Sequence, residues 1–230
     1  MKYNFEIILD KQSDLWNWLT AAQDKTNFGY PWRDQLDDSF KSFYDKIVLM
    51  SEEEARESIS EFLDNLYGQD QDIIHSNKKK LKKELSKKFN AACEWLEQTT
   101  KRPLYFKEYY IWLTTFPRCP YDPDKGYFWY NVYWRNGIVK TFLHEVLHFQ
   151  FIKYWRENPD SKVSKLPEAQ FELFKESLTV IIDEEIIDLT GSIDGGYPSH
   201  QAFRKVLHKE WRKHHDFDEL VDFGLQRLPK

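Results

Sequence analysis

The residues His144-Glu145-Val-Leu-His148 form an HExxH motif within an apolar segment of the chain. On a helix, residues four apart lie one above the other, with about 6 Å of rise between them, so two imidazoles at this spacing can converge on one ion. Glu145 then points around the helix toward the open side of that ion, where it can take a proton from water. Zinc in such a site lowers the pKa of water toward neutrality and supplies a nucleophile for attack on a carbonyl. The motif therefore predicts a zinc site with His144 and His148 as metal ligands and Glu145 as general base.

The alternative interpretation of this motif is structural. His144 and His148 would then be hydrogen-bonded core residues, with Glu145 as their partner. The surroundings argue against it, because burying a carboxylate without a partner costs free energy or forces it neutral. The apolar neighbours of the motif are Leu143, Val146, Leu147, Phe149, Phe151 and Ile152.

A catalytic zinc site also needs a third protein ligand. The residues after His148 run Phe-Gln-Phe-Ile-Lys-Tyr, without a further histidine, so the ligand must come from another segment. Glu168, Glu172 and Glu176 are spaced by four and share one helical face, so only one of them can lie at the height of the metal. Glu176 begins an apolar run, whereas the first two have polar surroundings that suit a helix N-terminus. We expect Glu176 to be the ligand, with Glu168 next and Asp194 as a weaker candidate.

A hydrolase needs a hydrogen-bond donor for the oxyanion that forms during attack. The segment Gly195-Gly-Tyr197-Pro-Ser-His200 offers two candidates, because a glycine loop after the ligand helix could bring Tyr197 or His200 over the metal. The alternative is a turn with an exposed histidine and a packed tyrosine.

The patterns of apolar residues and turn signals predict the elements that position these side chains. The strands are expected at Lys2–Leu9, Leu104–Phe116 and Gly126–Trp134, the last two forming a hairpin around a turn region at Pro117–Gly126. The helices are expected around Leu36–Ile47, from a Ser51–Glu54 capping box to Gly68, over Ile74–Leu96, Ile138–Trp155, Glu168–Leu189 and Ser199–Lys213, with a loop at Gly191–Pro198. Helices, then strands, then helices indicate an α+β domain with segregated layers. We interpret residues 1–230 as a single domain with a mainly helical part at 1–100 and the site-bearing part at 104–215.

Composition narrows the functional classes. Hydrophobic residues make up 41% and charged residues 31% of the 230 residues, which suits a folded core with an ordinary solvated surface. The net charge of -5 argues against a nucleic-acid binder. The basic run Lys78–Lys88 could serve such a role, but its leucines mark it as the outer face of an amphipathic helix.

Cysteine content and hydropathy favour a cytoplasmic location. Cys93 and Cys119 are too few for a disulfide framework, and no N-terminal stretch has the apolar core of a signal peptide. No apolar stretch approaches the ~18 residues of a membrane span. We expect no membrane partner and no nucleic-acid partner, and we interpret His208, His214 and His215 as surface histidines.

The order of a strand pair, an HExxH helix and a helix with a glutamate resembles the zincin superfamily, specifically its gluzincin branch, over residues 104–190. The segments His-Glu-x-x-His-Phe-Gln, Lys-Glu-Ser-Leu-Thr-Val and Gly-Tyr-Pro-x-His-Gln are similar to small bacterial zincin-like proteins without an assigned substrate. The thermolysin-like Asn-Glu-x-x-x-Asp form is absent, although Glu168 lies nearer the thermolysin-like distance from His148.

This resemblance implies a small mixed or antiparallel sheet packed on the HExxH helix. It implies a Zn²⁺ metallopeptidase or amidohydrolase that acts on a peptide or small amide, with the substrate beside the strand Gly126–Trp134. The second hypothesis is a non-catalytic zincin-like protein, in which the metal organises a binding or regulatory surface.

Overall fold

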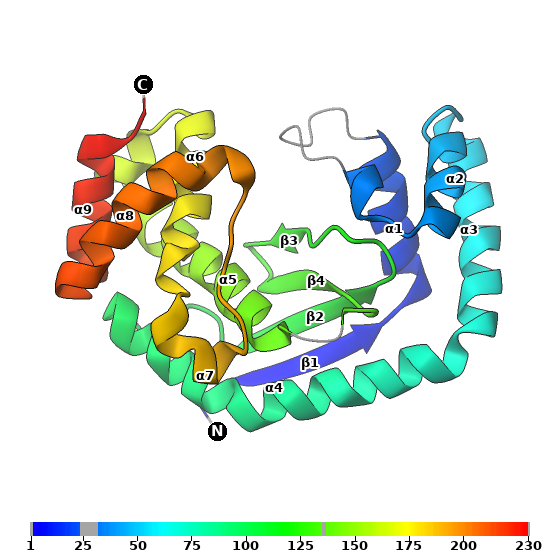
Figure 1. Cartoon of the computed structure of the whole chain (residues 1–230), viewed down its shortest axis with the longest axis horizontal. Coiled ribbons are helices and arrows are strands. Elements are labelled where there is room, and N and C mark those ends of the chain that lie inside the picture. The colour runs from blue at the N-terminus through cyan, green and yellow to red at the C-terminus, as the bar shows by residue number, and fades with distance from the viewer. Residues whose placement is uncertain (1, 24–31, 135–136, 230) are drawn as a thin grey trace.

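The computed structural model of the protein describes residues 2–23, 32–134 and 137–229. Helices surround a small sheet (Figure 1). The elements follow in the order β1 (Asn4–Leu9), α1 (Lys11–Gln23), η1 (Trp32–Gln35), α2 (Asp38–Ile47), α3 (Glu52–Gln69), α4 (Gln71–Thr100), β2 (Glu108–Thr114), β3 (Tyr121–Asp122), β4 (Tyr127–Asn131), α5 (Ile138–Phe151), η2 (Ile152–Arg156), η3 (Lys162–Lys165), α6 (Glu168–Leu178), η4 (Thr179–Ile181), η5 (Glu184–Ile186), α7 (Ile187–Thr190), η6 (Pro198–His200), α8 (Gln201–His214) and α9 (Phe217–Arg227). The predicted α+β class is confirmed, and the prediction of a single domain stays a prediction.

The four strands that the structure describes form one mixed sheet in the order β1-β2-β4-β3. β1 pairs with β2 and β2 pairs with β4 in parallel, whereas β3 is antiparallel to β4. The predicted hairpin between the two long strands is therefore wrong. The chain reverses at Asp122, whose Oδ1 accepts hydrogen bonds from the backbone N–H groups of Asp124 and Lys125, so that the short β3 becomes the antiparallel partner of β4.

The strand Gly126–Trp134, predicted to border the substrate, corresponds to β4 inside the sheet. β4 has neighbours on both sides, and β3, with Tyr121 and Asp122, is the edge strand beside it. The position of a substrate relative to these strands stays a prediction.

Alternation along the strands places one set of residues in the main core. This inner face is buried against α4 and α5 through Tyr109, Ile111, Leu113, Phe128 and Tyr130. A second apolar cluster lies among α1, α2 and α3 around Trp18, which is fully buried. The long helix α4, whose apolar stripe was predicted over Ile74–Leu96, belongs to the main core and runs along the sheet (Figure 1).

The buried carboxylate of Asp14 joins the helical cluster to the end of β2. It accepts hydrogen bonds from Thr114 Oγ1 at 2.6 Å, from the backbone N–H of Thr115 at 2.9 Å and from Tyr67 Oη at 3.2 Å. Asn17 extends this junction, because its Nδ2 donates to the carbonyl of Arg118 at 2.9 Å. The junction fixes the segment that follows β2, which forms one wall of the cleft described below.

The predicted helix Ile138–Trp155 is confirmed, with a change of helical type near its end. α5 ends at Phe151, and η2 continues it as a π-helix from Ile152 to Arg156. Gly137 precedes the helix with a φ of 98°, a conformation that glycine adopts without steric cost. None of the described helices combines the length and the apolar character that a membrane-spanning segment needs.

The predicted helix Glu168–Leu189 is broken into shorter pieces. α6 ends at Leu178, where the chain enters a run of β-branched residues with low helix propensity. Arg204 Nη1 of α8 also donates a hydrogen bond to the carbonyl of Glu176 at 2.9 Å, which satisfies a carbonyl at the end of the helix. Asp183 then starts a new turn by accepting a hydrogen bond from the N–H of Glu185. The predicted helix Ser199–Lys213 corresponds to η6 and α8, whereas α1 and α9 were not predicted.

Candidate metal centre

Helix α5 presents the HExxH motif as a compact group of ligand atoms. The rings of His144 and His148 lie one turn apart, with their centroids 4.4 Å from each other. One ligand atom from each of His144, Glu145 and His148 lies within 4.8 Å of the other two. This group could therefore hold a metal ion.

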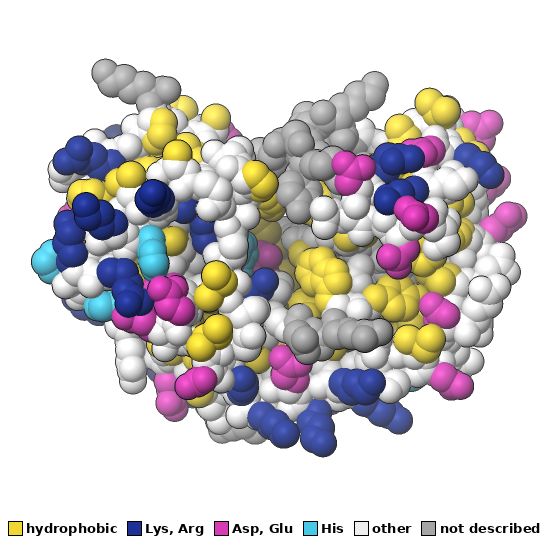
Figure 2. Space-filling model, viewed as in Figure 1, with side chains coloured by type: hydrophobic (Ala, Val, Ile, Leu, Met, Phe, Trp, Pro, Cys, Tyr) yellow, Lys and Arg dark blue, Asp and Glu magenta, His cyan; other side chains and the backbone are white. Residues whose placement is uncertain are grey.

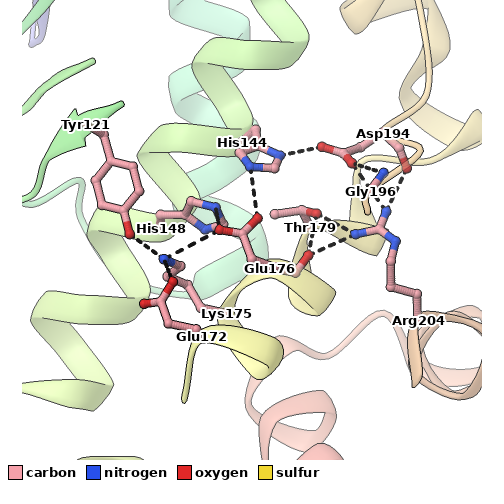
Figure 3. Close-up of polar contacts among 10 residues, drawn as sticks. All are labelled: Tyr121, His144, His148, Glu172, Lys175, Glu176, Thr179, Asp194, Gly196 and Arg204. Atoms are coloured by element: carbon pink, nitrogen blue, oxygen red, sulfur yellow. Dashed lines mark hydrogen bonds and ion pairs between the residues drawn. The ribbon is translucent and has the colours of Figure 1, made fainter. Parts of the chain in front are cut away.

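Glu176 of α6 meets both histidines (Figure 3). Its Oε2 lies 3.5 Å from His144 Nε2, and its Oε1 lies 3.2 Å from His148 Nε2. The Nε2 atoms of both rings therefore face the carboxylate of Glu176. Glu176 is thus placed where the sequence predicted a third ligand.

Asp194 contacts the other nitrogen of His144. Its Oδ2 lies 2.5 Å from His144 Nδ1, while its Oδ1 accepts a hydrogen bond from the backbone N–H of Gly196 and lies 3.3 Å from Arg204 Nη2. Asp194 was predicted as an alternative metal ligand. The structure instead places it behind the imidazole, where it orients the ring and fixes its tautomer.

A buried lysine adds a positive charge that the sequence did not reveal. The ammonium of Lys175 contacts the hydroxyl of Tyr121, lies 2.7 Å from Glu172 Oε2 and 3.5 Å from Glu176 Oε1 (Figure 3). Burial alone lowers the pKa of Lys175, but the neighbouring Tyr121, Glu176 and Glu172 raise it above its ordinary value. Lysine beside a glutamate has no spacing signature, so only the fold shows this contact.

Burial raises the pKa of Glu145 to about 8 and lowers the pKa of His148 to about 4. Burial also lowers the pKa of His144, but Asp194 and Glu176 outweigh it and raise that pKa above its ordinary value. Glu145 Oε2, His148 Nδ1 and His148 Nε2 are buried without a hydrogen-bond partner among the described residues, since the contact of Nε2 with Glu176 lacks hydrogen-bond geometry. A neutral His148 keeps a lone pair that a cation can use. Unpaired buried groups of this kind are costly unless a ligand satisfies them.

These residues line a cleft of about 550 Å³. Its walls include His144, Glu145, Glu176, Asp194, Tyr121 and Tyr197. Figure 2 shows the surface hollowed between the N-terminal and C-terminal helices, with hydrophobic side chains gathered in the hollow. Because a metal ion held by the motif would face open space, a substrate could reach it.

The predicted oxyanion donors are placed differently from each other. Tyr197 lines the cleft, whereas His200 is not among the lining residues; the centroids of the two rings lie 5.4 Å apart. The Nδ1 of His200 is buried without a hydrogen-bond partner among the described residues, and burial lowers the pKa of the ring. Their role in stabilising an oxyanion stays a prediction.

The remaining glutamates of α6 contact other partners. Glu168 is exposed and pairs with Arg156 at 3.0 Å. Glu172 lines the cleft but is held by Lys175. A second group of possible ligands combines the buried Asp183 with the exposed Glu184 and the half-buried His208. Arg212 lies 3.7 Å from each of the two carboxylates.

Comparison of the chain with protein-family models, with curated proteins and with solved structures found no match. The resemblance to zincins therefore depends on the motif and on the arrangement around it. The described residues show an α+β protein with a His144-Glu145-His148 group on a helix, and this group could bind a metal ion.

Proposed function

We propose that the protein is a zinc-dependent hydrolase that cleaves a peptide or amide bond. His144, His148 and Glu176 would hold the metal, and Glu145 would act as general base. The observation that carries the proposal is the convergence of both Nε2 atoms on one carboxylate at the wall of an open cleft.

The donor set and its hydrogen bonding support a metal at this point. Two imidazoles and one carboxylate are a ligand set typical of catalytic zinc. The structural interpretation required Glu145 to be the hydrogen-bond partner of the histidines, yet its Oε2 and both nitrogens of His148 lack partners among the described residues. These unpaired buried atoms are what a site prepared for a cation would have.

When bound, zinc would polarise the scissile carbonyl and lower the pKa of water. The carboxylate of Glu145 would take the proton from the attacking water and pass it to the leaving amine. Asp194 would keep His144 oriented, and Tyr197 or His200 would donate to the oxyanion.

The open cleft favours this function over a non-catalytic metal site. A purely structural zinc site closes its fourth position with a protein ligand. Two other carboxylates at the cleft are engaged elsewhere, because Asp194 binds His144 Nδ1 and Glu172 binds Lys175. A catalytic role would also account for the unpaired Glu145, for which a structural zinc has no use.

The first experiment is the metal content of the purified protein by elemental mass spectrometry. The wild type should contain about one zinc per chain, and His148→Ala should contain almost none. His75→Ala removes an exposed histidine of α4 and should keep the metal. A wild type without metal, even after zinc is added back, would require the hydrolase proposal to be abandoned.

A further inference from the structure

The outer face of the sheet carries a second cavity, of about 620 Å³. The register places Trp112 beside Trp129, and Tyr127 beside Asp122, on this face. Trp16 of α1 packs on Trp129 with ring centroids 5.0 Å apart. We call this cavity the aromatic hollow, and its lining combines these rings with the carboxylates of Asp10, Asp122 and Asp124.

The rings are arranged around a common space. Trp112 and Trp129 lie nearly parallel, with an interplanar angle of 24° and centroids 6.3 Å apart. The ring of Tyr127 stands at 73° to Trp112 and at 72° to Trp129. Aromatic walls in two orientations can surround a small cation, which is attracted to the negative faces of the rings.

The chain itself already places a cation at this hollow. Lys125 Nζ lies 5.5 Å from the centroid of Tyr127 and 3.5 Å from Asp122 Oδ2. Its side chain is 67% exposed, so an incoming group could displace it at little cost. Lys153 pairs with Asp124 at 2.7 Å, and Asp10 accepts a hydrogen bond from the N–H of Ser13. The charge that faces the rings beside Tyr127 is thus the Asp122 carboxylate, with Lys125 as its exchangeable partner.

The hollow borders the cleft. Tyr121 lines both cavities. In β3, Tyr121 points toward the histidines, whereas the register puts the next residue, Asp122, on the face of the hollow.

We propose that the aromatic hollow binds the basic side chain, lysine or arginine, of a peptide. Aromatic faces and a carboxylate match the ammonium or guanidinium of such a side chain. That this peptide is the substrate of the neighbouring cleft rests on the function proposed above. The binding itself does not require the metal.

The test is a titration of the zinc-free protein, followed through its indole ¹H–¹⁵N signals by NMR. The probe is Nα-acetyl-L-lysine amide, and the matched control is Nα-acetyl-L-norleucine amide, which has a similar aliphatic chain without the charge. The lysine probe should shift the signals of Trp112 and Trp129, assigned with Trp112→Phe and Trp129→Phe, in a saturable way. Equal shifts with both probes, or no shift with either, would overturn the proposal.

Two variants test the role of charge without disturbing the rings. Lys125→Gln removes the internal competitor and should tighten binding by about threefold, whereas Asp122→Asn should weaken it by a similar factor. The asparagine keeps an oxygen that can accept the two hydrogen bonds of the turn. Lys162→Gln, an exposed lysine elsewhere, should leave the affinity unchanged. If Lys125→Gln and Asp122→Asn both leave it unchanged, the hollow is not a cation site.

These outcomes separate the two proposals. Binding of the lysine probe by a protein that never retains zinc would support the proposed binding site in the aromatic hollow and contradict the proposed hydrolase function. Turnover of peptides with no preference for a basic residue, together with no binding of the probe, would support the proposed hydrolase function and contradict the proposed binding site in the aromatic hollow.

Discussion

Asp194 Oδ2 and Glu176 Oε2 lie against opposite nitrogens of the His144 ring, at 2.5 Å from Nδ1 and 3.5 Å from Nε2. When the ring is neutral, a proton on Nδ1 is bound by Asp194, and the lone pair of Nε2 is directed at the space beside Glu176. Asp194 is itself fixed by Arg204, whose Nη2 donates to its carbonyl oxygen at 2.6 Å. The orientation of a candidate ligand therefore depends on a loop fifty residues away along the chain.

Removing this carboxylate should weaken metal binding without removing a ligand. Asp194→Ala is expected to reduce zinc affinity about 10- to 100-fold, because His144 loses the group that fixes its orientation and tautomer. Asp194→Asn should reduce zinc affinity less than Asp194→Ala does, since the amide oxygen can still accept a hydrogen bond from Nδ1–H of His144. Affinity is measured by competition with a chromogenic chelator.

The control for this series is Asp188→Asn, which changes an exposed carboxylate. Equal zinc affinity in the wild type and in Asp194→Ala would mean that Asp194 plays no part in positioning the ring.

Glu145→Gln should separate metal binding from turnover. The variant is expected to retain zinc, because Glu145 is not one of the proposed ligands, and to lose about 10²- to 10⁴-fold in rate. Turnover is measured against a peptide library with the zinc-loaded proteins, and Glu94→Gln on the exposed face of α4 is the control. Full activity in Glu145→Gln would refute its role as general base.

The local part of the site could be predicted from the sequence, and the rest could not. The spacing of His144 and His148 fixes their relation on any helix, and the structure confirms the helix. The position of Glu176 beside them agrees with its place at the start of an apolar run. Lys175 and Tyr121 were missed because they meet only through the packing of α6 against β3, which leaves no pattern in the sequence.

The errors in the fold have the same origin. The strand patterns of β2 and β4 suggested a hairpin, but the relative direction of two strands depends on their pairing with other strands. The strand β3 has only two residues, which is too short for a recognisable strand pattern. The break after α6 depends on Arg204, which arrives from a later helix. Contacts with residues that are distant in the sequence determine each of these features.

The stability of the protein should depend on pH through Asp14. Burial raises the pKa of its carboxyl from 3.8 to about 6, despite the hydrogen bonds from Thr114, Thr115 and Tyr67. Between these pH values the unfolded chain releases the proton before the folded protein does, so the free energy of unfolding falls as the pH rises. The total change from this group is about 3 kcal/mol.

Asp14→Asn cannot titrate at this position, so its disadvantage in unfolding free energy relative to the wild type should shrink from pH 4 to pH 7. Urea denaturation across that range gives the difference, with the exposed Asp160→Asn as control for the substitution itself. A constant or widening difference would contradict the assignment.

Two helical glycines should respond to alanine with opposite signs. A Cβ at Gly224 in α9 would lie 2.7 Å from Phe174 Cζ and 3.2 Å from Leu207 Cδ2, so Gly224→Ala should destabilise the protein by about 1–3 kcal/mol. At Gly68 in α3 nothing lies within 4 Å, and Gly68→Ala should stabilise it by about 0.5 kcal/mol. Thermal unfolding of the two variants measures both. Stabilisation in both variants would show that the packing around Phe174 adjusts freely.

The parallel pairing of β1 with β2 has a consequence for how the chain acquires its structure. Asn4 pairs with Glu108, and Asp14 binds Thr114 a hundred positions later, so neither contact can form until nearly half of the chain has been synthesised. The apolar cluster around Trp18 draws almost entirely on residues 15–66 and can collapse earlier. Contacts between distant positions slow folding because the entropy of loop closure must be overcome first. The strand β1, although it precedes β2 in the chain by about a hundred residues, should thus be among the last to pair.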